Sequence, residues 1–142
     1  MIIRTFDAGD RDAVIALWRD VFPEYADASR PQRDPALSIA NKMKTQPELF
    51  FVGSLDGEVI GTVMAGYDGH RGWVYSLAVA RERQGRGYGS ALMKHAEASL
   101  AKLGCPKVNL QILSIKTDLR GFYEKLGYRM DEVVSLGKRI SK

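Results

Sequence analysis

Residues 81–90 read Arg-Glu-Arg-Gln-Gly-Arg-Gly-Tyr-Gly-Ser, and they stand between a strand-like stretch and a helix-like stretch. The preceding residues 72–79 have the pattern of a buried strand, whereas from Tyr88 the apolar residues repeat at helical spacing until Gly104. Alternating glycines at such a junction let the backbone wrap closely around a ligand with its N–H groups pointing inward. The following helix adds the positive end of its dipole, so the segment predicts a phosphate-binding loop; the alternative is a plain glycine-rich turn with solvated arginines.

The spacing of these glycines argues against the two common nucleotide-binding motifs. A Walker A loop requires Gly-x-x-x-x-Gly-Lys-Ser/Thr, and no lysine stands at the matching place. A dinucleotide fingerprint requires Gly-x-Gly-x-x-Gly, but the third glycine position holds Ser90 when counted from Gly85 and Leu92 when counted from Gly87. The loop therefore predicts a phosphate ligand in another kind of fold.

Outward from the loop, strand and helix patterns predict one α+β domain over residues 1–142. Strands are expected at residues 2–6, 49–54, 58–67, 72–79, 107–113, 128–131 and 133–140, and helices at 7–22, 36–44, 88–103 and 117–126. Asp56-Gly57 and Asp68-Gly69 join the middle strands and predict antiparallel hairpins. The strand, helix and strand around the glycine loop predict a parallel crossover unit.

The composition narrows the class of protein. With 142 residues, 45% of them hydrophobic and 27% charged, the chain matches an ordinary soluble domain, and no apolar run is long enough to span a membrane. Cys105 is the single cysteine, which excludes an internal disulfide and favours a cytoplasmic location, and neither His70 nor His95 has a second histidine at metal-ligand spacing. The net charge of +4 is too small and too evenly distributed to indicate nucleic-acid binding. No metal, nucleic-acid or membrane partner is therefore expected.

Two motifs resemble those of a known family. The stretch Gln84-Gly85-Arg86-Gly87-Tyr88-Gly89, preceded by Leu77-Ala78-Val79 and followed by Ser90, resembles the acetyl-CoA pyrophosphate motif Gln/Arg-x-x-Gly-x-Gly/Ala of the GNAT superfamily of N-acetyltransferases. Residues 121–128 are similar to its second motif, Phe/Leu-Tyr-x-x-x-Gly-Phe/Tyr. The resemblance covers nearly the whole chain and points to small single-domain bacterial members of the YpeA type. It implies a mixed, mostly antiparallel sheet of about six to seven strands flanked by about four helices.

The resemblance also implies an activity and a site. The activity is transfer of an acetyl group from acetyl-CoA, as co-substrate, to a primary amine by direct attack in a ternary complex, and relatives of this kind often pair as homodimers. The cofactor-binding residues are then Leu77, Ala78 and Val79, along which the pantetheine arm lies, and the pyrophosphate loop Gln84, Gly85, Arg86, Gly87, Tyr88, Gly89 and Ser90. Tyr123 becomes the general acid for the leaving thiolate, although its place on the apolar stripe of its helix is by itself typical of a core residue.

The chain departs from the family pattern at three positions. Gln111 stands where several relatives carry a glutamate base, and in the second motif Lys116 stands where asparagine is common and Leu119 where alanine is common. At pH 7 a lysine with a pKa of about 10.4 is neutral roughly once in 2,500 molecules, whereas an α-amine with a pKa of about 7.8 is neutral roughly once in seven. A site without a carboxylate base is therefore expected to prefer α-amines.

Two other functions remain open on the sequence alone. The replacement at Gln111 also suits an acyl-CoA-binding module or regulator that has lost turnover. The arginines of residues 81–86 allow a small nucleic-acid binder, which the mild net charge disfavours.

Overall fold

The computed structural model describes residues 1–27, 29–30, 33–113, 116 and 118–141. Its residue contacts divide the chain into a first unit, Met1–Gln111, and a second unit, Ile112–Lys142. The first unit contains β1 (Ile2–Thr5), η1 (Ala8–Asp10), α1 (Arg11–Val21), η2 (Pro23–Ala26), α2 (Pro35–Lys42), η4 (Pro47–Leu49), β2 (Phe50–Leu55), β3 (Glu58–Tyr67), β4 (Gly72–Val79), η5 (Arg81–Arg83), α3 (Tyr88–Lys102) and β5 (Val108–Asn109). The second unit contains α4 (Leu119–Lys125).

A five-stranded mixed sheet forms the centre of the first unit. The strands follow the order β1-β2-β3-β4-β5, with antiparallel pairing from β1 to β4 and parallel pairing between β4 and β5. Asp56 and Gly57 both have positive φ, as a tight hairpin turn requires. The Asp68 carboxylate accepts hydrogen bonds from the N–H groups of His70 and Arg71 at 2.8 and 2.7 Å and so closes the second turn. The predicted α+β class, the two hairpins and the crossover unit are therefore confirmed.

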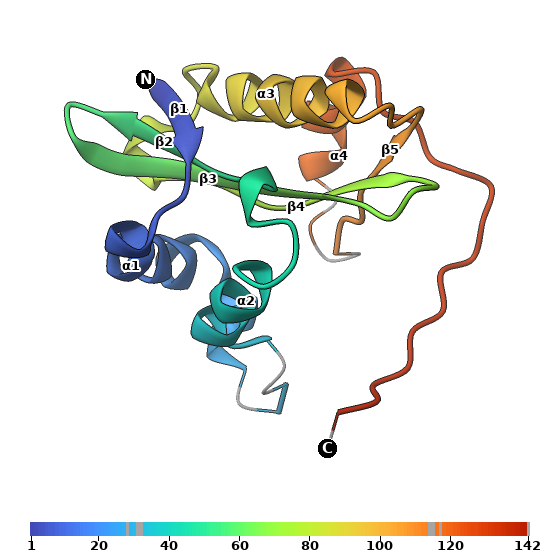
Figure 1. Ribbon diagram of the computed structural model, residues 1–142, viewed down its shortest axis with the longest axis horizontal. Coiled ribbons are helices and arrows are strands. Elements are labelled where there is room, and N and C mark those ends of the chain that lie inside the picture. Colours follow the sequence, from blue (N-terminus) through green and yellow to red (C-terminus); the bar gives the residue numbers. More distant parts are fainter. Residues whose placement is uncertain (28, 31–32, 114–115, 117, 142) are drawn as a thin grey trace. The chain divides into compact units, whose positions relative to one another are not determined.

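Helices cover both faces of this sheet, with α1 and α2 on one side and α3 on the other (Figure 1). The core on the side of α1 contains Trp18, Phe50 and Met64, all with no exposed surface. On the other side α3 packs through Leu92, Met93, Ala96 and Leu100, which are fully buried. A Cβ atom at Gly61 would stand 2.8 Å from a Leu92 methyl and 3.0 Å from the Ala78 carbonyl, so the absent side chain lets α3 approach the sheet.

One extra residue interrupts β4 where it pairs with β3. Thr62 pairs with Ala78, but Met64, two residues further along β3, pairs with Tyr75 rather than Ser76. Ser76 has a φ of 54°, in the left-handed region that a serine rarely adopts. This β-bulge bends the strand and increases its twist.

The predicted strand count is wrong at the carboxyl end. The strand expected over 107–113 is reduced to Val108–Asn109, which pairs with Gly72 and Trp73 before the bulge bends β4. Residues 128–131 and 133–140 form no strand among the described residues, and Val133, Val134, Leu136 and Ile140 are exposed. Alternation predicts which side chains share a face, but a strand forms only where a neighbour pairs with its backbone, so the expected six to seven strands become five.

The second unit is small, and its helix is shorter than expected. Residue 117, the first residue of the predicted helix 117–126, lies outside the described residues, and α4 spans Leu119–Lys125. None of the described helices is long and apolar enough to cross a membrane.

Candidate functional site

The glycine loop joins β4 to α3 through two left-handed residues. After η5, Gly85 has a φ of 78° and Gly87 a φ of 85°. Among the described residues, chain neighbours aside, no atom lies within 4 Å of the place of a Cβ at either glycine, so the backbone conformation rather than crowding requires glycine here. A side chain at a left-handed position costs about 1 kcal/mol or more, because its Cβ crowds the carbonyl. Both positions therefore keep an open backbone, as a loop that approaches a ligand closely requires.

The first turn of α3 presents unoccupied backbone donors. Gly87 is the N-cap and supplies no side-chain hydrogen bond, and the first bond within the helix runs from the Ala91 N–H to the Gly87 carbonyl at 3.1 Å. The N–H groups of Tyr88, Gly89 and Ser90 precede that bond at the positive end of the helix dipole. Backbone donors at a helix N-terminus are a fitting partner for a phosphate group.

Two side-chain contacts fix the start of the loop. The Gln84 amide Nε2 donates to the Val79 carbonyl at 2.9 Å, which ties the loop to the end of β4. Arg81 donates to the Asp20 main-chain carbonyl and lies 3.4 Å from the Asp20 carboxylate. Arg81 therefore anchors the loop to the end of α1, while Arg86 is exposed in the loop itself.

The second half of β4 has an edge that no described strand covers. The Ala80 N–H donates to the Ile60 carbonyl at 2.8 Å, and N–H directions alternate along a strand, so Ala78 also bonds toward β3. The backbone N–H groups of Leu77 and Val79 accordingly point to the opposite edge. In the described part of the chain β5 pairs with β4 only at Gly72 and Trp73, so this edge is open beside the loop. Of the three predicted residues, Leu77 and Val79 offer backbone groups there, and Ala78 is 4% exposed and packs in the core.

A buried polar chain converges on the bulge, and sequence reasoning missed it. The Trp18 indole N–H donates to the Thr62 hydroxyl at 2.8 Å, and that hydroxyl donates to the Ser76 carbonyl at 2.9 Å. Burial raises the pKa of the nearby Tyr25 phenol, and interaction of its hydroxyl with the side chains of Ser76 and Ser38 opposes that rise. The available signal was Thr62 itself, a hydroxyl residue within the buried apolar run of β3.

Beside the bulge lies a second feature that the sequence did not indicate, a buried lysine. Lys42 of α2 is 4% exposed; its ammonium donates to the Ala65 carbonyl and lies 5.5 Å from the centre of the Tyr75 ring. Desolvation lowers the pKa of Lys42 from its ordinary value. The ammonium holds Tyr75, the neighbour of Ser76, against the end of α2.

The predicted general acid lies in the second unit. Tyr123 of α4 packs edge-on against Phe122 and Tyr128, with ring centres 5.0 and 6.0 Å away. Burial raises the pKa of its phenol, so the hydroxyl keeps its proton at neutral pH. Of the three departures from the family pattern, Gln111 is exposed at the end of the first unit, and Lys116 and Leu119 belong to the second.

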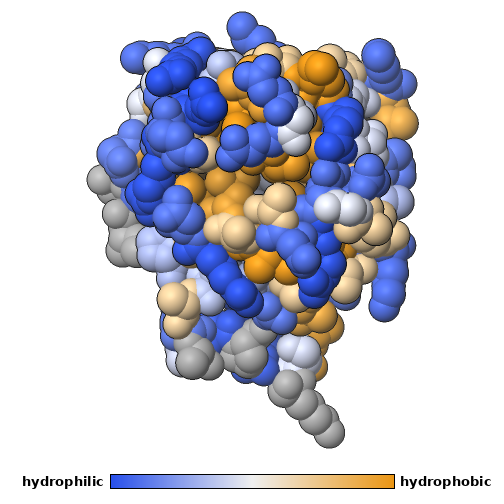
Figure 2. All heavy atoms as spheres, turned by 90° about the vertical axis from the view of Figure 1, so that its left-hand side faces the viewer, coloured by the Kyte–Doolittle hydropathy of each residue, from blue (hydrophilic) through white to orange (hydrophobic). Residues whose placement is uncertain are grey.

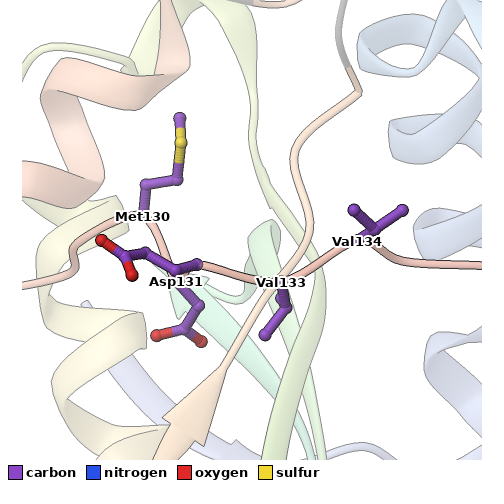
Figure 3. A pocket seen from close by; sticks show the side chains of 5 residues that line it. Met130, Asp131, Val133 and Val134 are labelled. Carbon is purple, nitrogen blue, oxygen red and sulfur yellow. The ribbon is translucent and has the colours of Figure 1, made fainter.

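Surface features add little to this site. The side of the molecule drawn in Figure 2 has hydrophobic residues gathered near its centre and hydrophilic residues around them. A shallow pocket is lined by five consecutive residues, 130–134, whose side chains point in different directions from an extended segment (Figure 3). It contains none of the predicted site residues. Within the described ranges, no three His, Cys, Asp or Glu side chains gather as a metal site would require.

Comparisons with known proteins agree on one family. The model of the acetyltransferase (GNAT) family matches residues 12–128. Acetyltransferases of Yersinia enterocolitica and Yersinia pseudotuberculosis are each 41% identical over 140 residues, which cover 99% of this chain and 96% of the relative.

Solved structures share the fold at lower identity. The PaiA N-acetyltransferase of Thermoplasma acidophilum, solved in complex with coenzyme A, superimposes with a TM-score of 0.81 at 18% identity, covering 94% of this chain and 92% of that one. Ard1 of Thermoplasma volcanium superimposes with a TM-score of 0.80 at 24% identity, covering 92% of this chain and 83% of that one.

Proposed function

Because the chain belongs to the acetyltransferase (GNAT) family and is thus an N-acetyltransferase, we propose that it transfers the acetyl group of acetyl-CoA to a primary amine by direct attack in a ternary complex. The observation that carries the proposal is the junction of β4 and α3, where an open strand edge leads directly to an uncapped helix N-terminus. The two units then act together as one N-acetyltransferase domain, since the family model spans parts of both.

The loop would hold the pyrophosphate of the co-substrate. The N–H groups from Gln84 to Ser90 would donate to its oxygens, with the left-handed glycines Gly85 and Gly87 bringing the backbone close. Arg86, exposed in the loop, would add positive charge, while Arg81 is engaged by Asp20. The pantetheine arm would lie along the open edge of β4 and pair with Leu77 and Val79 as an added strand does.

The same edge would stabilise charge during the reaction. As the amine nitrogen attacks the thioester carbon, a C–N bond forms and negative charge develops on the carbonyl oxygen. An N–H group held in place beforehand stabilises this oxyanion, and the Leu77 N–H points to the edge where the thioester would lie. The C–S bond then breaks as the carbonyl reforms, and the nitrogen, positively charged after the attack, releases one proton to solvent to leave the neutral amide.

Tyr123 would supply the proton that the departing thiolate requires. Its raised pKa keeps the phenol protonated through neutral pH, and it acts as an acid below that pKa. The attacking nitrogen must be neutral beforehand, and Gln111 accepts no proton at physiological pH. The acceptor is therefore proposed to be an amine of modest pKa, with α-amines favoured over lysine side chains.

The proposal is tested by mixing the protein with acetyl-CoA and a panel of amino acids, peptides, polyamines and protein lysines, and by measuring CoA thiol release. We expect thiol release with at least one class of amine, and a rate that rises with pH as the acceptor deprotonates. A clear preference for lysine at neutral pH would overturn the α-amine assignment. Acetyl-CoA binding without thiol release for any amine would favour a non-catalytic acyl-CoA-binding module.

The acid role of Tyr123 is tested by Tyr123→Phe, with Tyr67→Phe as the matched loss of a hydroxyl elsewhere. We expect kcat to fall about 100-fold in Tyr123→Phe with the melting temperature nearly unchanged, and Tyr67→Phe to keep its activity. A merely structural role for Tyr123 would instead lower the stability and leave the rate in place.

A further inference from the structure

We infer that Thr62 is a positioning residue for acetyl transfer, because its hydroxyl holds the Ser76 bulge that aims the Leu77 N–H at the thioester. The inference rests on the proposed function, and it concerns a buried residue that touches neither co-substrate nor acceptor. Thr62 lies at the centre of β3 with no exposed surface. Its side chain lies on the face of the sheet that α1 covers, where it meets Trp18.

The register of β3 and β4 shows what the bulge does to the backbone. Between the pair Thr62–Ala78 and the pair Met64–Tyr75, β4 has one residue more than β3. The extra residue shifts the register with β3 by one, so the N–H groups of β4 after the bulge are displaced relative to those before it. The direction of the Leu77 N–H toward the open edge thus depends on the conformation of Ser76.

Ser76 does not adopt this conformation without support. Its φ of 54° is costly for a residue with a side chain, and such strain persists only where the surroundings determine it. The Thr62 hydroxyl donates to the Ser76 carbonyl at 2.9 Å and so fixes the peptide plane between Ser76 and Leu77. That same plane contains the Leu77 N–H.

The Thr62 hydroxyl is itself oriented by Trp18. The indole N–H donates to the hydroxyl oxygen at 2.8 Å, so the hydroxyl proton is left to point at the Ser76 carbonyl. A valine would fill the same space within the apolar core, but it would leave the buried Trp18 N–H and the Ser76 carbonyl without the Thr62 hydroxyl as a partner, and an unpaired buried polar group costs stability. The position therefore uses threonine for hydrogen bonds that packing alone does not require.

A second residue lies near the side chain of Ser76. Burial raises the pKa of the Tyr25 phenol, carried by η2, and interaction of its hydroxyl with the side chains of Ser76 and of Ser38 in α2 opposes that rise. The Tyr25 ring stacks on Trp18 with the ring centres 5.9 Å apart, so one aromatic pair supports both contacts to Ser76. Removing the Tyr25 hydroxyl is expected to have the weaker effect, since it leaves the Ser76 carbonyl bond in place.

The test compares Thr62→Val with Thr62→Ser and with Val14→Ala. Valine keeps the shape and removes the hydroxyl, serine keeps the hydroxyl, and Val14→Ala weakens the same core without touching Ser76. We expect Thr62→Val to lower kcat about tenfold or more, because it misdirects an oxyanion donor. The KM for acetyl-CoA should change by less than about threefold in this variant, because the pyrophosphate loop is intact. Thr62→Ser should recover most of kcat, and Val14→Ala should lose stability only.

Amide NMR resonances of Ser76 and Leu77 provide a readout that does not depend on turnover. Thr62→Val should shift both resonances in the free protein, whereas Val14→Ala should leave them in place. Unshifted resonances in Thr62→Val, or an equal loss of kcat in Val14→Ala, would overturn the inference while leaving acetyl transfer established. Shifted resonances in a protein whose wild type turns over no amine would show that Thr62 holds the bulge, but they would overturn the proposed function and with it the role of Thr62 in acetyl transfer.

Discussion

The helices α2 and α3 begin in opposite ways. At α2 the Asp34 carboxylate accepts from the Ala36 N–H at 3.2 Å, and Pro35 occupies the first turn without an N–H. At α3 the N-cap is Gly87, which has no side chain to donate or accept, and the next residues include another glycine and a serine. A side chain of the protein caps the start of α2 and none caps the start of α3, where we propose that the backbone donors bind the co-substrate.

The start of α1 belongs with that of α2. The 3-10 turn η1 that precedes it is closed by a capping box. The Asp10 carboxylate accepts from the Asp7 N–H, and the Asp7 carboxylate accepts from the backbone of the turn. Arg4 adds two hydrogen bonds to Asp10, at 2.7 and 2.9 Å. The chain thus closes η1, just before α1, and the start of α2 with its own side chains, whereas we propose that the start of α3 binds the substrate. A substitution at the first two is expected to affect stability, and one at the start of α3 to affect binding.

The largest effect on acetyl-CoA binding is expected from Gly87→Ala. At a φ of 85° an alanine is strained, and relief of that strain would move the first N–H groups of α3 out of place. We expect the Kd for acetyl-CoA, measured by calorimetry, to rise about 30-fold, equivalent to roughly 2 kcal/mol. Gly104→Ala is the matched control, since Gly104 has a φ of 84° and equally open surroundings just after α3. If Gly104→Ala weakens acetyl-CoA binding as much, the loss is not specific to the start of α3, and the proposed binding there is contradicted.

Asp10→Asn should destabilise the fold by about 1–2 kcal/mol at pH 7, because a buried charge-assisted contact and part of a cap are lost. Arg4 holds the pKa of Asp10 below its ordinary value, chiefly by hydrogen bonding. A carboxylate with a lowered folded pKa stabilises the protein above its unfolded pKa, and this contribution is lost as pH falls through the folded value. The free energies of unfolding of wild type and variant, measured by denaturant titration, should therefore converge at acid pH. A difference that persists in acid would contradict the ionic origin of the stabilisation.

Asp34→Ala should cost about 1 kcal/mol of folding free energy, the usual value of an N-cap. Urea denaturation measures the loss, and Asp34→Asn, which keeps a cap oxygen, should recover most of it. Acetyl-CoA affinity should stay unchanged in both variants. A weaker affinity would mean that the start of α2 also serves the substrate.

The smallest effect is expected from Arg81→Ala. Because Arg81 is engaged by Asp20 and is more than half exposed, its removal should raise the Kd for acetyl-CoA by less than about threefold. Arg86→Ala, which removes an exposed arginine of the loop, should weaken binding more, and the excess should shrink at high salt. Equal losses in the two variants would show that Arg81 reaches the phosphates.

The glycine loop and the hairpins could be predicted from the sequence because their determinants are local. Asp56-Gly57 marks a hairpin through its own backbone preference, and Gly85 and Gly87 lie where a loop between strand and helix requires them. The helix α3 is the clearest case, since its apolar residues and its terminal glycine lie within a single stretch. Residue types with strong backbone preferences therefore located the hairpins and the glycine loop, whereas the binding of acetyl-CoA by that loop stays a prediction.

Pairing over distance could not be predicted in the same way. The left-handed Ser76 depends on Thr62 and Trp18, which stand 14 and 58 residues earlier in the chain. Lys42 resembles any surface lysine until the fold buries it beneath Tyr75. The prediction of strands over 128–131 and 133–140 was wrong for the same reason, because an alternating pattern carries no information about a partner strand.

The most direct test of the central claim is an amide NMR titration of the protein with acetyl-CoA. Binding at the uncapped helix start predicts the largest shifts at the N–H groups of residues 85–90, smaller ones at Leu77 and Val79, and none at the first turn of α2. Shifts that leave residues 85–90 unmoved while the protein is saturated would contradict the account.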